Sequence, residues 1–577
     1  MAPTLKRTAN SWWLLLIGVF LVGLNWLASL YHTRVDLTAE KRFTLSGSTR
    51  KLLKNLDERV DITVLLTGEI KSEFKKLSVS VKELLENFRN YGGNNIQFRF
   101  ELPAEGLNDS LKADVFDSLV RLGLRPTNQQ VQTSAGEGKS QQQIFPGAVI
   151  RCGNRTVAID FLQGQVQKNV FNSADILDKQ SINSAEALLE YKFASAIQQI
   201  TQKEVPLVGY MYGNGEPVFG MPFVNDLFSI LARDYVIDTI NIKTAPIIPA
   251  DFKTIVIVKP AEKFTINDKF KLDQYVMKGG RILWLVDVLY AERDSLQNGN
   301  LTAYSRDLDV GDLLFRYGAR INNDLLLDRH SDKIPLDVGF VGGQPQRALL
   351  NWPYFPLLQP ASGHPIVKNM SDVLGQFVNT IDTVEAENID KTILLSSSPD
   401  SYREKTPAII DINSVKNDAG LERYNLKNLA AAVLLEGRFR SFFSNRVSQA
   451  QLDTLQHYHE QYLQECINPN RMIVVSDADI VVNSISESIG PLPMGVNKFT
   501  KIQYANREFF QNCMAYLANK DNMLDSRAKD YSLRLLDLKK VTAQKTTWQL
   551  INIALPIVLV FLFALVYQWL RKRRYTR

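Results

Sequence analysis

The sequence predicts an α/β protein held between two membrane-spanning helices. Apolar residues run almost unbroken from Trp12 to Tyr31 and again from Trp548 to Leu570, and about 20 helical residues are enough to cross the core of a bilayer. Between these runs, short apolar strands alternate with amphipathic helices, which is the pattern of sheets covered by helices. The 577 residues are 45% hydrophobic and 22% charged, so the part between the runs can bury substantial cores.

The two apolar runs also predict a membrane topology. The first run is longer than the apolar core of a signal peptide, which has about 7–15 residues, and no small-x-small cleavage pattern follows it. We therefore expect a retained helix. In the second run, Pro556 is compatible with a membrane helix. The tail after Leu570 carries five basic residues and no acid. Because positive flanks favour the cytoplasm, we expect both tails in the cytoplasm and the large body outside it.

Composition argues against several classes of function. The formal net charge is +6, and the C-terminal tail supplies five of these charges, so the nearly neutral body does not indicate a nucleic-acid-binding surface. Cys152, Cys466 and Cys513 have no CxxC spacing, which predicts neither a disulfide framework nor a metal site. The chain has only five histidines, and we expect no zinc site.

Residues 32–182 predict a small α/β module. Ser46 is placed to cap a helix that runs to Leu56. Apolar residues at helical spacing predict a second helix from Ser78 to Tyr91, and a polar stretch follows from Thr127 to Gln143. Strands are expected at Val60–Leu66, Ile96–Leu102, Gly147–Arg151 and Thr156–Phe161. This order resembles a thioredoxin-like module, although it contains no redox CxxC.

Residues 183–519 predict a larger α/β domain built on a parallel sheet. Asn183 is expected to cap a helix that ends at Thr201, and Thr265 and Asp268 form a capping pair for a later helix. A Pro- and Gly-rich loop region is expected from Pro335 to Pro365. The strands are expected at Val205–Tyr212, Tyr235–Ile242, Thr254–Lys259, Arg281–Val288, Thr392–Ser396, Leu429–Leu435 and Arg471–Ser476, and the further helices at Val224–Arg233, Thr265–Lys278 and Lys501–Leu517.

Three further segments complete the predicted organisation. Residues 1–31 hold the N-terminal tail and the first membrane helix. Residues 520–546 form a charged juxtamembrane segment, and residues 547–577 hold the second membrane helix and the basic tail.

Two glycine-containing segments resemble phosphate loops in part. Gly138-Lys139-Ser140 resembles the end of a Walker loop, but no strand precedes it and Thr133 stands where the first glycine is required. Gly213-Asn214-Gly215 does follow a predicted strand, yet a dinucleotide fingerprint needs a glycine where Val218 stands. We therefore expect no nucleotide cofactor. The second segment is either a turn that uses positive φ at its glycines or a contact for a ligand or partner.

The sequence offers no catalytic nucleophile or metal set. It contains no GxSxG elbow. Glu216 and Asp287 follow predicted strands and are expected to approach one another at the sheet edge, or else to be solvated strand-end carboxylates. Asp477 and Asp479 have the spacing for a divalent cation, but the chain offers no complementary ligand set.

The sequence therefore predicts a possible ligand or partner edge made of Gly213, Asn214, Gly215, Glu216 and Asp287. The aromatic cluster of Trp352, Tyr354 and Phe355 either packs, contacts a partner or stacks on a sugar or peptide.

Several ordered blocks resemble a known family. The blocks are RVDLTAEKRFTLS, VPLVGYMYGNGEP, FTINDKFKLDQYVMKGGRILWLVDV, NWPYFPLLQP, HPIVKNM, LEGRFRSFFSNR and RMIVVSDADIVVNS. They resemble the auxiliary, extracytoplasmic component of bacterial ABC transport systems, which is often labelled substrate-binding, and the two terminal spans fit the gliding-motility member of that family.

The resemblance implies a fold and a set of partners. The second domain would be flavodoxin- or amidotransferase-like, similar to a domain of an intraflagellar-transport protein, and without catalytic residues. The protein would lie in the inner membrane of a gliding bacterium with its body in the periplasm, and it would act with a permease subunit and a separate cytoplasmic ATPase. Two other functions stay open, namely a membrane-anchored enzyme acting on envelope sugars or peptides and a small-solute receptor.

Overall fold

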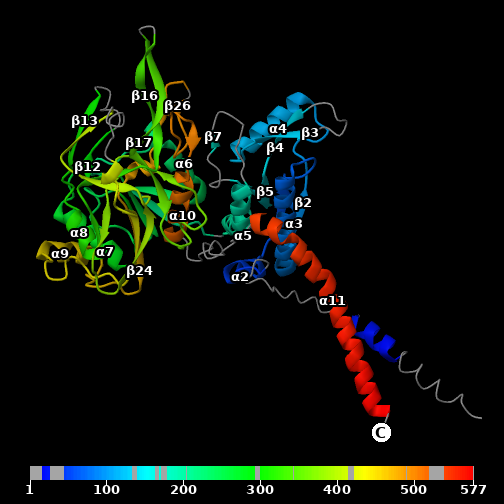
Figure 1. Cartoon of the computed structure of the whole chain (residues 1–577). Coiled ribbons are helices and arrows are strands. Elements are labelled where there is room, and N and C mark those ends of the chain that lie inside the picture. The colour runs from blue at the N-terminus through cyan, green and yellow to red at the C-terminus, as the bar shows by residue number, and fades with distance from the viewer. Residues whose placement is uncertain are drawn as a thin grey trace, which may run out of the picture. The chain divides into compact units, whose positions relative to one another are not determined.

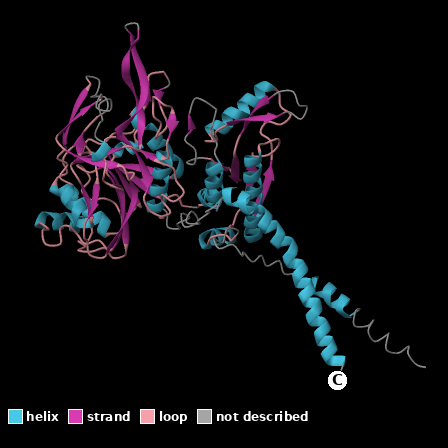
Figure 2. Cartoon of the chain, viewed as in Figure 1, coloured by secondary structure: helices cyan, strands magenta, loops and turns pink. Residues whose placement is uncertain are grey.

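The computed structural model describes most of the chain, in two compact units that comprise residues 1–529 and 530–577. The described residues are 16–25, 44–132, 139–162, 168–169, 179–202, 204–292, 299–341, 344–412, 421–488, 490–518 and 538–575. Figure 1 gives the element labels used below, and Figure 2 separates helices from strands.

The N-terminal part forms a small α/β module around a four-stranded sheet. The strand order is β2-β1-β5-β6, with β1 parallel to β2 and antiparallel to β5. Ser46 caps α2 as predicted, because its hydroxyl accepts a hydrogen bond from the backbone N–H of Thr49 at 3.2 Å. The elements are α2 (Gly47–Lys54), β1 (Val60–Val64), α3 (Ser72–Gly92), β2 (Ile96–Phe100), α4 (Asp109–Arg121), β3 (Thr127–Gln132), β4 (Lys139–Ile144), β5 (Gly147–Cys152), β6 (Arg155–Asp160), β7 (Lys168–Asn169) and α5 (Lys179–Thr201).

The described residues of the polar stretch from Thr127 to Gln143 lie in two antiparallel strands, β3 and β4. One local prediction for this region was wrong. Asn183 does not cap a helix, because α5 begins four residues earlier, at Lys179. The apolar side of α5 packs in the core of the small module through residues such as Leu189 and Phe193, whereas the sequence grouped residues 183–201 with the larger domain.

The larger sheet is mixed rather than wholly parallel, which corrects the sequence prediction. Its order is β16-β17-β20-β23-β24-β11-β10-β8-β9. The strands from β24 to β9 are parallel to one another, and those from β23 to β16 pair antiparallel. These strands are β8 (Leu207–Tyr212), β9 (Val236–Asn241), β10 (Thr254–Val258), β11 (Arg281–Leu285), β16 (Ser331–Val341), β17 (Gln344–Pro360), β20 (Ile389–Ser396), β23 (Ala430–Gly437) and β24 (Asn470–Val475).

Helices cover both faces of the parallel strands. Along β10, Val256 and Val258 face one core while Ile255 and Ile257 face the other. The first core is closed by α6 (Asn225–Asp234) and α10 (Asn506–Ala518), and the second by α7 (Ile266–Met277) and α8 (Gly311–Tyr317). In Figure 1 these two helix pairs lie on opposite sides of the sheet. The continuous apolar strands seen in the sequence follow from this burial on both faces.

The chain reverses its direction of travel across the sheet at β8. From β8 it passes outward to β9 and then returns to β10, so that β8 lies between β9 and β10. In open α/β sheets, such a reversal leaves a crevice at the carboxyl ends of the two central strands. The fold therefore places the turn after β8 beside the segment after β10.

Most of the predicted loop region from Pro335 to Pro365 lies instead in two long paired strands, since β16 covers residues 335–341 of it and β17 covers residues 344–360. β16 and β17 pair antiparallel with register shifts at Ser331/Lys333 and Asp337/Gly339, and the hairpin projects at the top of Figure 1. Pro335 is tolerated because it lies in β16, which is an edge strand with register shifts. Trp352, Tyr354 and Phe355 of β17 are buried in a core of their own, so the packing interpretation of the aromatic cluster is confirmed.

The described part of the larger domain also contains short strands and one more helix. The short strands are β12 (Leu289–Tyr290), β13 (Asn300–Ser305), β14 (Ala319–Ile321), β15 (Asp324–Asp328), β18 (Val373–Leu374), β19 (Ile381–Thr383), β21 (Ser401–Lys405), β22 (Ala408–Asp411), β25 (Ile485–Ser486), β26 (Gly490–Pro491) and β27 (Ile502–Gln503), and the remaining helix is α9 (Gln449–His457). The predicted helix from Lys501 thus starts later, at Asn506, because Ile502 and Gln503 pair with β7.

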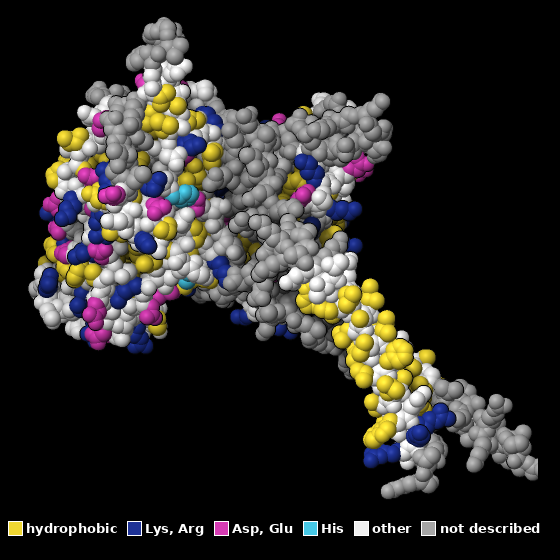
Figure 3. All heavy atoms as spheres, in the orientation of Figure 1, with side chains coloured by type: hydrophobic (Ala, Val, Ile, Leu, Met, Phe, Trp, Pro, Cys, Tyr) yellow, Lys and Arg dark blue, Asp and Glu magenta, His cyan; other side chains and the backbone are white. Residues whose placement is uncertain are grey.

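The second unit contains α11 (Leu538–Tyr575). Its segment Thr546–Arg573 contains an 18-residue window with a mean hydropathy of 2.7 and is long enough to cross a membrane. Figure 3 shows this helix covered with hydrophobic side chains and ending in Lys and Arg. At the other end of the chain, the described helix Leu16–Asn25 is apolar but shorter than a span. The rest of the predicted first span lies outside the described residues.

Candidate ligand cleft at the edge of the parallel strands

Charged side chains follow the carboxyl ends of four neighbouring parallel strands. Glu216 follows β8, Lys259 follows β10, Asp287 follows β11, and Asp477 and Asp479 follow β24. The strands are parallel, so these ends share one edge of the sheet, where doubly wound α/β proteins bind their ligands. A cleft of about 660 Å³ opens there, within the range of about 300–1,000 Å³ for ligand sites.

The turn after β8 forms one wall of this cleft. Gly213 and Gly215 adopt φ values of +124° and +80°, which residues with a Cβ rarely adopt. A Cβ on Gly215 would also lie 2.9 Å from the Cβ of Ala261. The carbonyl of Asn214 accepts hydrogen bonds from the N–H groups of Ala261 and Glu262 at 2.8 and 2.7 Å. The two glycines therefore let the turn dock against the segment that follows β10.

Glu216 is a buried carboxyl group on that wall. Its side chain is 5% exposed, and Oε2 accepts a hydrogen bond from the N–H of Asn214 at 2.7 Å. Burial raises the pKa of Glu216 to about 7, against the opposing effect of backbone hydrogen bonds. Within the described residues, Oε1 of Glu216 and both polar atoms of the Asn214 side chain have no hydrogen-bond partner. Such unpaired buried groups are costly in a folded protein.

Lys259 connects the ends of three strands. Its Nζ lies 2.6 Å from Asp479 Oδ1, 3.2 Å from Glu292 Oε2 and 3.4 Å from Asp287 Oδ2. Burial alone would lower the pKa of Lys259, but the carboxylates outweigh burial and raise it above its usual value. The backbone of Lys259 has φ of +49°, a strained conformation of the kind that clusters at functional sites.

Asp287 belongs to the Lys259 network and does not pair with Glu216. Its Oδ1 accepts a hydrogen bond from the N–H of Ala478 at 2.6 Å, and burial raises its pKa to about 6 although Lys259 opposes this. No hydrogen bond or ion pair joins Asp287 to Glu216 in the described part of the chain. Of the five residues singled out from the sequence, Gly215 and Glu216 line the cleft, whereas Gly213, Asn214 and Asp287 are not among its lining residues.

The fold adds lining residues that no sequence pattern indicated. Arg306 lies with its guanidinium 4.4 Å from the ring centre of Tyr290 and donates a hydrogen bond to the carbonyl of Pro260 at 3.3 Å. Met221, Phe223 and Ile485 contribute apolar surface. Lys259 could have been singled out from the sequence, because it is a charged residue directly after an apolar strand. Its partners become evident only in the fold.

The remaining sequence candidates have structural explanations. The spacing of Asp477 and Asp479 had suggested a cation site, but Asp479 pairs with the ammonium group of Lys259. In the described segments, no group of three or more His, Cys, Asp or Glu is arranged to hold a metal ion. Lys139 and Ser140 lie in strand β4 rather than in a loop before a helix.

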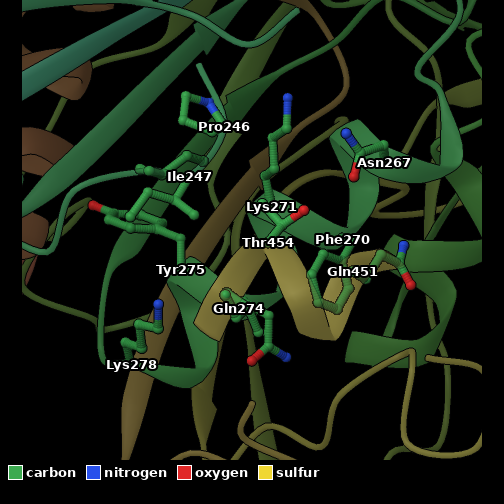
Figure 4. A pocket seen from close by; sticks show the side chains of 12 residues that line it. Pro246, Ile247, Asn267, Phe270, Lys271, Gln274, Tyr275, Lys278, Gln451 and Thr454 are labelled. Carbon is green, nitrogen blue, oxygen red and sulfur yellow. The ribbon is translucent and has the colours of Figure 1, made fainter. Parts of the chain in front are cut away.

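A second hollow lies between α7 and α9 (Figure 4), but at about 10 Å³ it has room for about one water molecule.

Two family models match different parts of the chain. A family model described as "ABC-type uncharacterized transport system" matches residues 206–513, and a "Domain of unknown function (DUF7088)" matches residues 39–151. An "Uncharacterized protein" of Borreliella burgdorferi is 21% identical over 449 residues, which are 75% of this chain and 78% of that protein.

Two solved structures resemble the chain only weakly. The "mmIFT52 N-terminal domain" is 12% identical with a TM-score of 0.30 and covers 54% of this chain and 98% of that chain. The "Exo-beta-1,4-mannosidase Op5Man5 from Opitutaceae bacterium strain TAV5" is 10% identical with a TM-score of 0.21 and covers 59% of this chain and 39% of that chain. At these TM-scores neither likeness bears on the fold.

Proposed function

The chain belongs to the family described as an ABC-type uncharacterized transport system, and on this basis we propose that it is a non-enzymatic auxiliary subunit of a bacterial ABC transporter complex linked to gliding motility. The observation that carries the proposal is the family match, which spans more than half of the chain. In this proposal a membrane permease subunit and a separate cytoplasmic ATPase are its partners. In this proposal the separate ATPase hydrolyses ATP, because the segments at Gly138-Lys139-Ser140 and Gly213-Asn214-Gly215 lack the residues of a phosphate loop.

The proposed topology is two-pass in the inner membrane. The helix Thr546–Arg573 supplies one span, and the apolar run from Trp12 to Tyr31 supplies the other. The basic tails then lie in the cytoplasm, in line with the preference of Lys and Arg for that side, and the two α/β parts face the periplasm. The flavodoxin- or amidotransferase-like character of the larger domain is supported by its strand order, in which the first strand lies between the second and the third.

The cleft beside Glu216 is the proposed contact site for cargo or a partner. Its wall contains unpaired buried polar atoms, and its volume of about 660 Å³ suits a ligand or a peptide segment. Binding there would be coupled to the permease mechanically, through the two membrane helices.

Co-purification tests the proposal. The full chain would be extracted from its native membrane in mild detergent, and the proteins that accompany it would be identified and quantified. We expect a permease and an ATPase subunit at a fixed ratio. A chain that emerges alone, although both subunits are present in the same membranes, would overturn the proposal.

The second candidate is a membrane-anchored enzyme acting on envelope sugars or peptides. The observation that favours it is the pKa of Glu216, raised to about 7 by burial, because general acids and bases have pKa values near the working pH. Glu216→Gln and Asp287→Asn separate the two functions. An enzyme would lose turnover of envelope fragments while keeping its partners, whereas an auxiliary subunit shows no turnover in either form.

A further inference from the structure

Exposed apolar side chains lie on the segments that line the cleft, and we call them its rim. The rim consists of five partly exposed side chains, which are Val218 (40%), Phe219 (75%), Met221 (37%), Ile485 (46%) and Phe499 (38%). Single exposed apolar residues are common on protein surfaces, but several around one cleft mark an interaction site. Met221 and Ile485 line the cleft directly, and Val218 and Phe499 follow lining residues in the sequence. Phe219 lies on the short segment that joins the lining residues Pro217 and Met221.

Hydrogen bonds hold the two halves of the rim together. The N–H of Asn483 donates to the carbonyl of Phe223 at 2.6 Å, and Asn483 Oδ1 accepts from the N–H of Asp226 at 3.1 Å. Asp226 Oδ2 in turn accepts from the N–H of Met494 at 2.8 Å. The ring of Phe219 packs edge-on to Phe228, with 5.3 Å between ring centres. The rim is thus formed by packed segments that are far apart in the sequence, which keeps its apolar side chains in place around the opening.

The charges inside the cleft favour a basic group. The lining residues include four carboxylates, namely Glu216, Glu292, Asp479 and Glu487, and three cations, namely Lys259, Arg306 and Lys498. Lys259 is already bound by Asp479, Glu292 and Asp287. Among the described residues, neither Glu216 nor Glu487 has an ion-pair partner. A positively charged ligand could therefore form ion pairs with these two carboxyl groups, whereas a negatively charged ligand would be repelled by them.

We propose that this cleft binds an extended peptide segment of a partner protein, in which apolar side chains flank a basic one. The apolar side chains cover Phe219 and Ile485 on the rim, and the basic side chain enters toward Glu216 and Glu487. This inference names the partner chemistry of the site in the proposed function and rests on that function. Its basis is the combination of an apolar rim with uncompensated carboxylates, since a small polar solute would leave the rim exposed to water.

A peptide-binding measurement tests the inference. The full chain in lipid nanodiscs is titrated into the fluorescently labelled peptide acetyl-Ala-Leu-Lys-Leu-Ala-amide, and binding is followed by fluorescence anisotropy. We expect saturable binding that weakens as salt is added, because the charges are partly exposed. The same peptide with Gln in place of Lys, or with Ser in place of both Leu residues, is expected to bind more weakly.

Variants of the rim and of the cleft locate the binding. Phe219→Ser and Ile485→Ser are each expected to weaken binding by about fivefold or more, as for central apolar contacts. Glu487→Gln is expected to weaken it by about two- to threefold, as for an exposed charge. Ile409→Ser, at a residue that is 71% exposed in β22, is the matched control and leaves binding unchanged.

The outcomes separate this inference from the proposed function. The inference is overturned if the peptide does not bind, if Ile409→Ser weakens binding as much as Phe219→Ser, or if acetyl-lysine-amide alone competes as strongly as the peptide. Should any of these occur while permease and ATPase subunits still co-purify, the proposed function stands without the peptide site. If the subunits never co-purify and the peptide still binds, the proposed function fails on its own test.

Discussion

Replacing Glu216 by Gln should make the protein more stable, by an amount that grows as the pH rises above 4.5 and levels off above pH 7. The substitution keeps the shape of the side chain and an oxygen that can accept the 2.7 Å hydrogen bond from the N–H of Asn214. It removes the cost of ionising a carboxyl group that is 5% exposed and has no ion-pair partner among the described residues. Below pH 4.5 the carboxyl is protonated in the folded and the unfolded chain, so the charge makes no difference there.

The magnitude follows from the change in pKa on folding. The folded pKa of Glu216 is about 7, raised from 4.5, and each pKa unit corresponds to about 1.4 kcal/mol. Because the folded pKa is the higher one, the wild-type chain loses stability as the pH rises from 4.5 toward 7. Above pH 7 the wild-type chain has lost about 3 kcal/mol of unfolding free energy through this group. The Glu216→Gln variant does not lose it, because glutamine does not ionise. For a cooperative unit of roughly 300 residues this corresponds to about 5 °C in melting temperature.

Thermal unfolding of the full chain in detergent, between pH 4.5 and pH 8.5, measures this effect. The melting temperatures of wild type and Glu216→Gln should converge at the acidic end and separate as the pH rises. Glu487→Gln, at an exposed carboxylate of the same cleft, is the control and should show no comparable gain. A difference between Glu216→Gln and wild type that is the same at every pH, or a variant that is less stable at pH 8.5, would refute the reasoning.

Three further substitutions test the packing around the cleft and the cores, each by thermal or denaturant unfolding of the full chain. Lys259→Met leaves Asp479 and Asp287 without their cation and should lower the free energy of unfolding by about 3–5 kcal/mol. The double variant Lys259→Met/Asp287→Asn should recover part of this loss, and equal stabilities of the two variants would contradict an ion pair between Lys259 and Asp287. Gly280→Ala places a Cβ 2.3 Å from the Tyr275 ring and should cost about 1–3 kcal/mol, whereas Gly311→Ala, whose Cβ meets nothing within 4 Å, should be nearly neutral. Trp352→Ala removes a 1% exposed side chain that contacts the rings of Phe355 and Phe377, with an expected cost of about 3–5 kcal/mol; unchanged stability would revive the interpretation of this cluster as a ligand platform.

Local signals in the sequence predicted most of the elements around the cleft. The strands that became β8, β10 and β11 are nearly continuous apolar runs, and such runs are typical of strands buried on both faces. Thr265 and Asp268 form the capping box at the start of α7, as their spacing predicted. These features depend on residues a few positions apart, and so they can be read from the chain without knowledge of its tertiary contacts.

The long hairpin of β16 and β17 shows where local signals failed. Its prolines and glycines predicted a loop, but β17 pairs with β16, β18 and β20, and burial of Trp352 and its aromatic neighbours favours the extended conformation. Bulges and an edge position accommodate residues that interrupt ordinary strands. The gain from burial outweighs local preference, and only the fold reveals which side chains are buried.

By itself, the sequence determined that the chain has α/β parts and an apolar C-terminal helix of membrane-spanning length, because periodicity and apolar length are properties of contiguous residues. It also placed Glu216 and Asp287 at strand ends. The tertiary structure decided that these two carboxyl groups belong to different networks. Asp287 pairs with Lys259, which also binds Asp479, a residue 220 positions after Lys259. The reason is strand order. Which strand ends become neighbours depends on how the chain reverses across the sheet, and contacts over such separations leave no local pattern in the residues that make them.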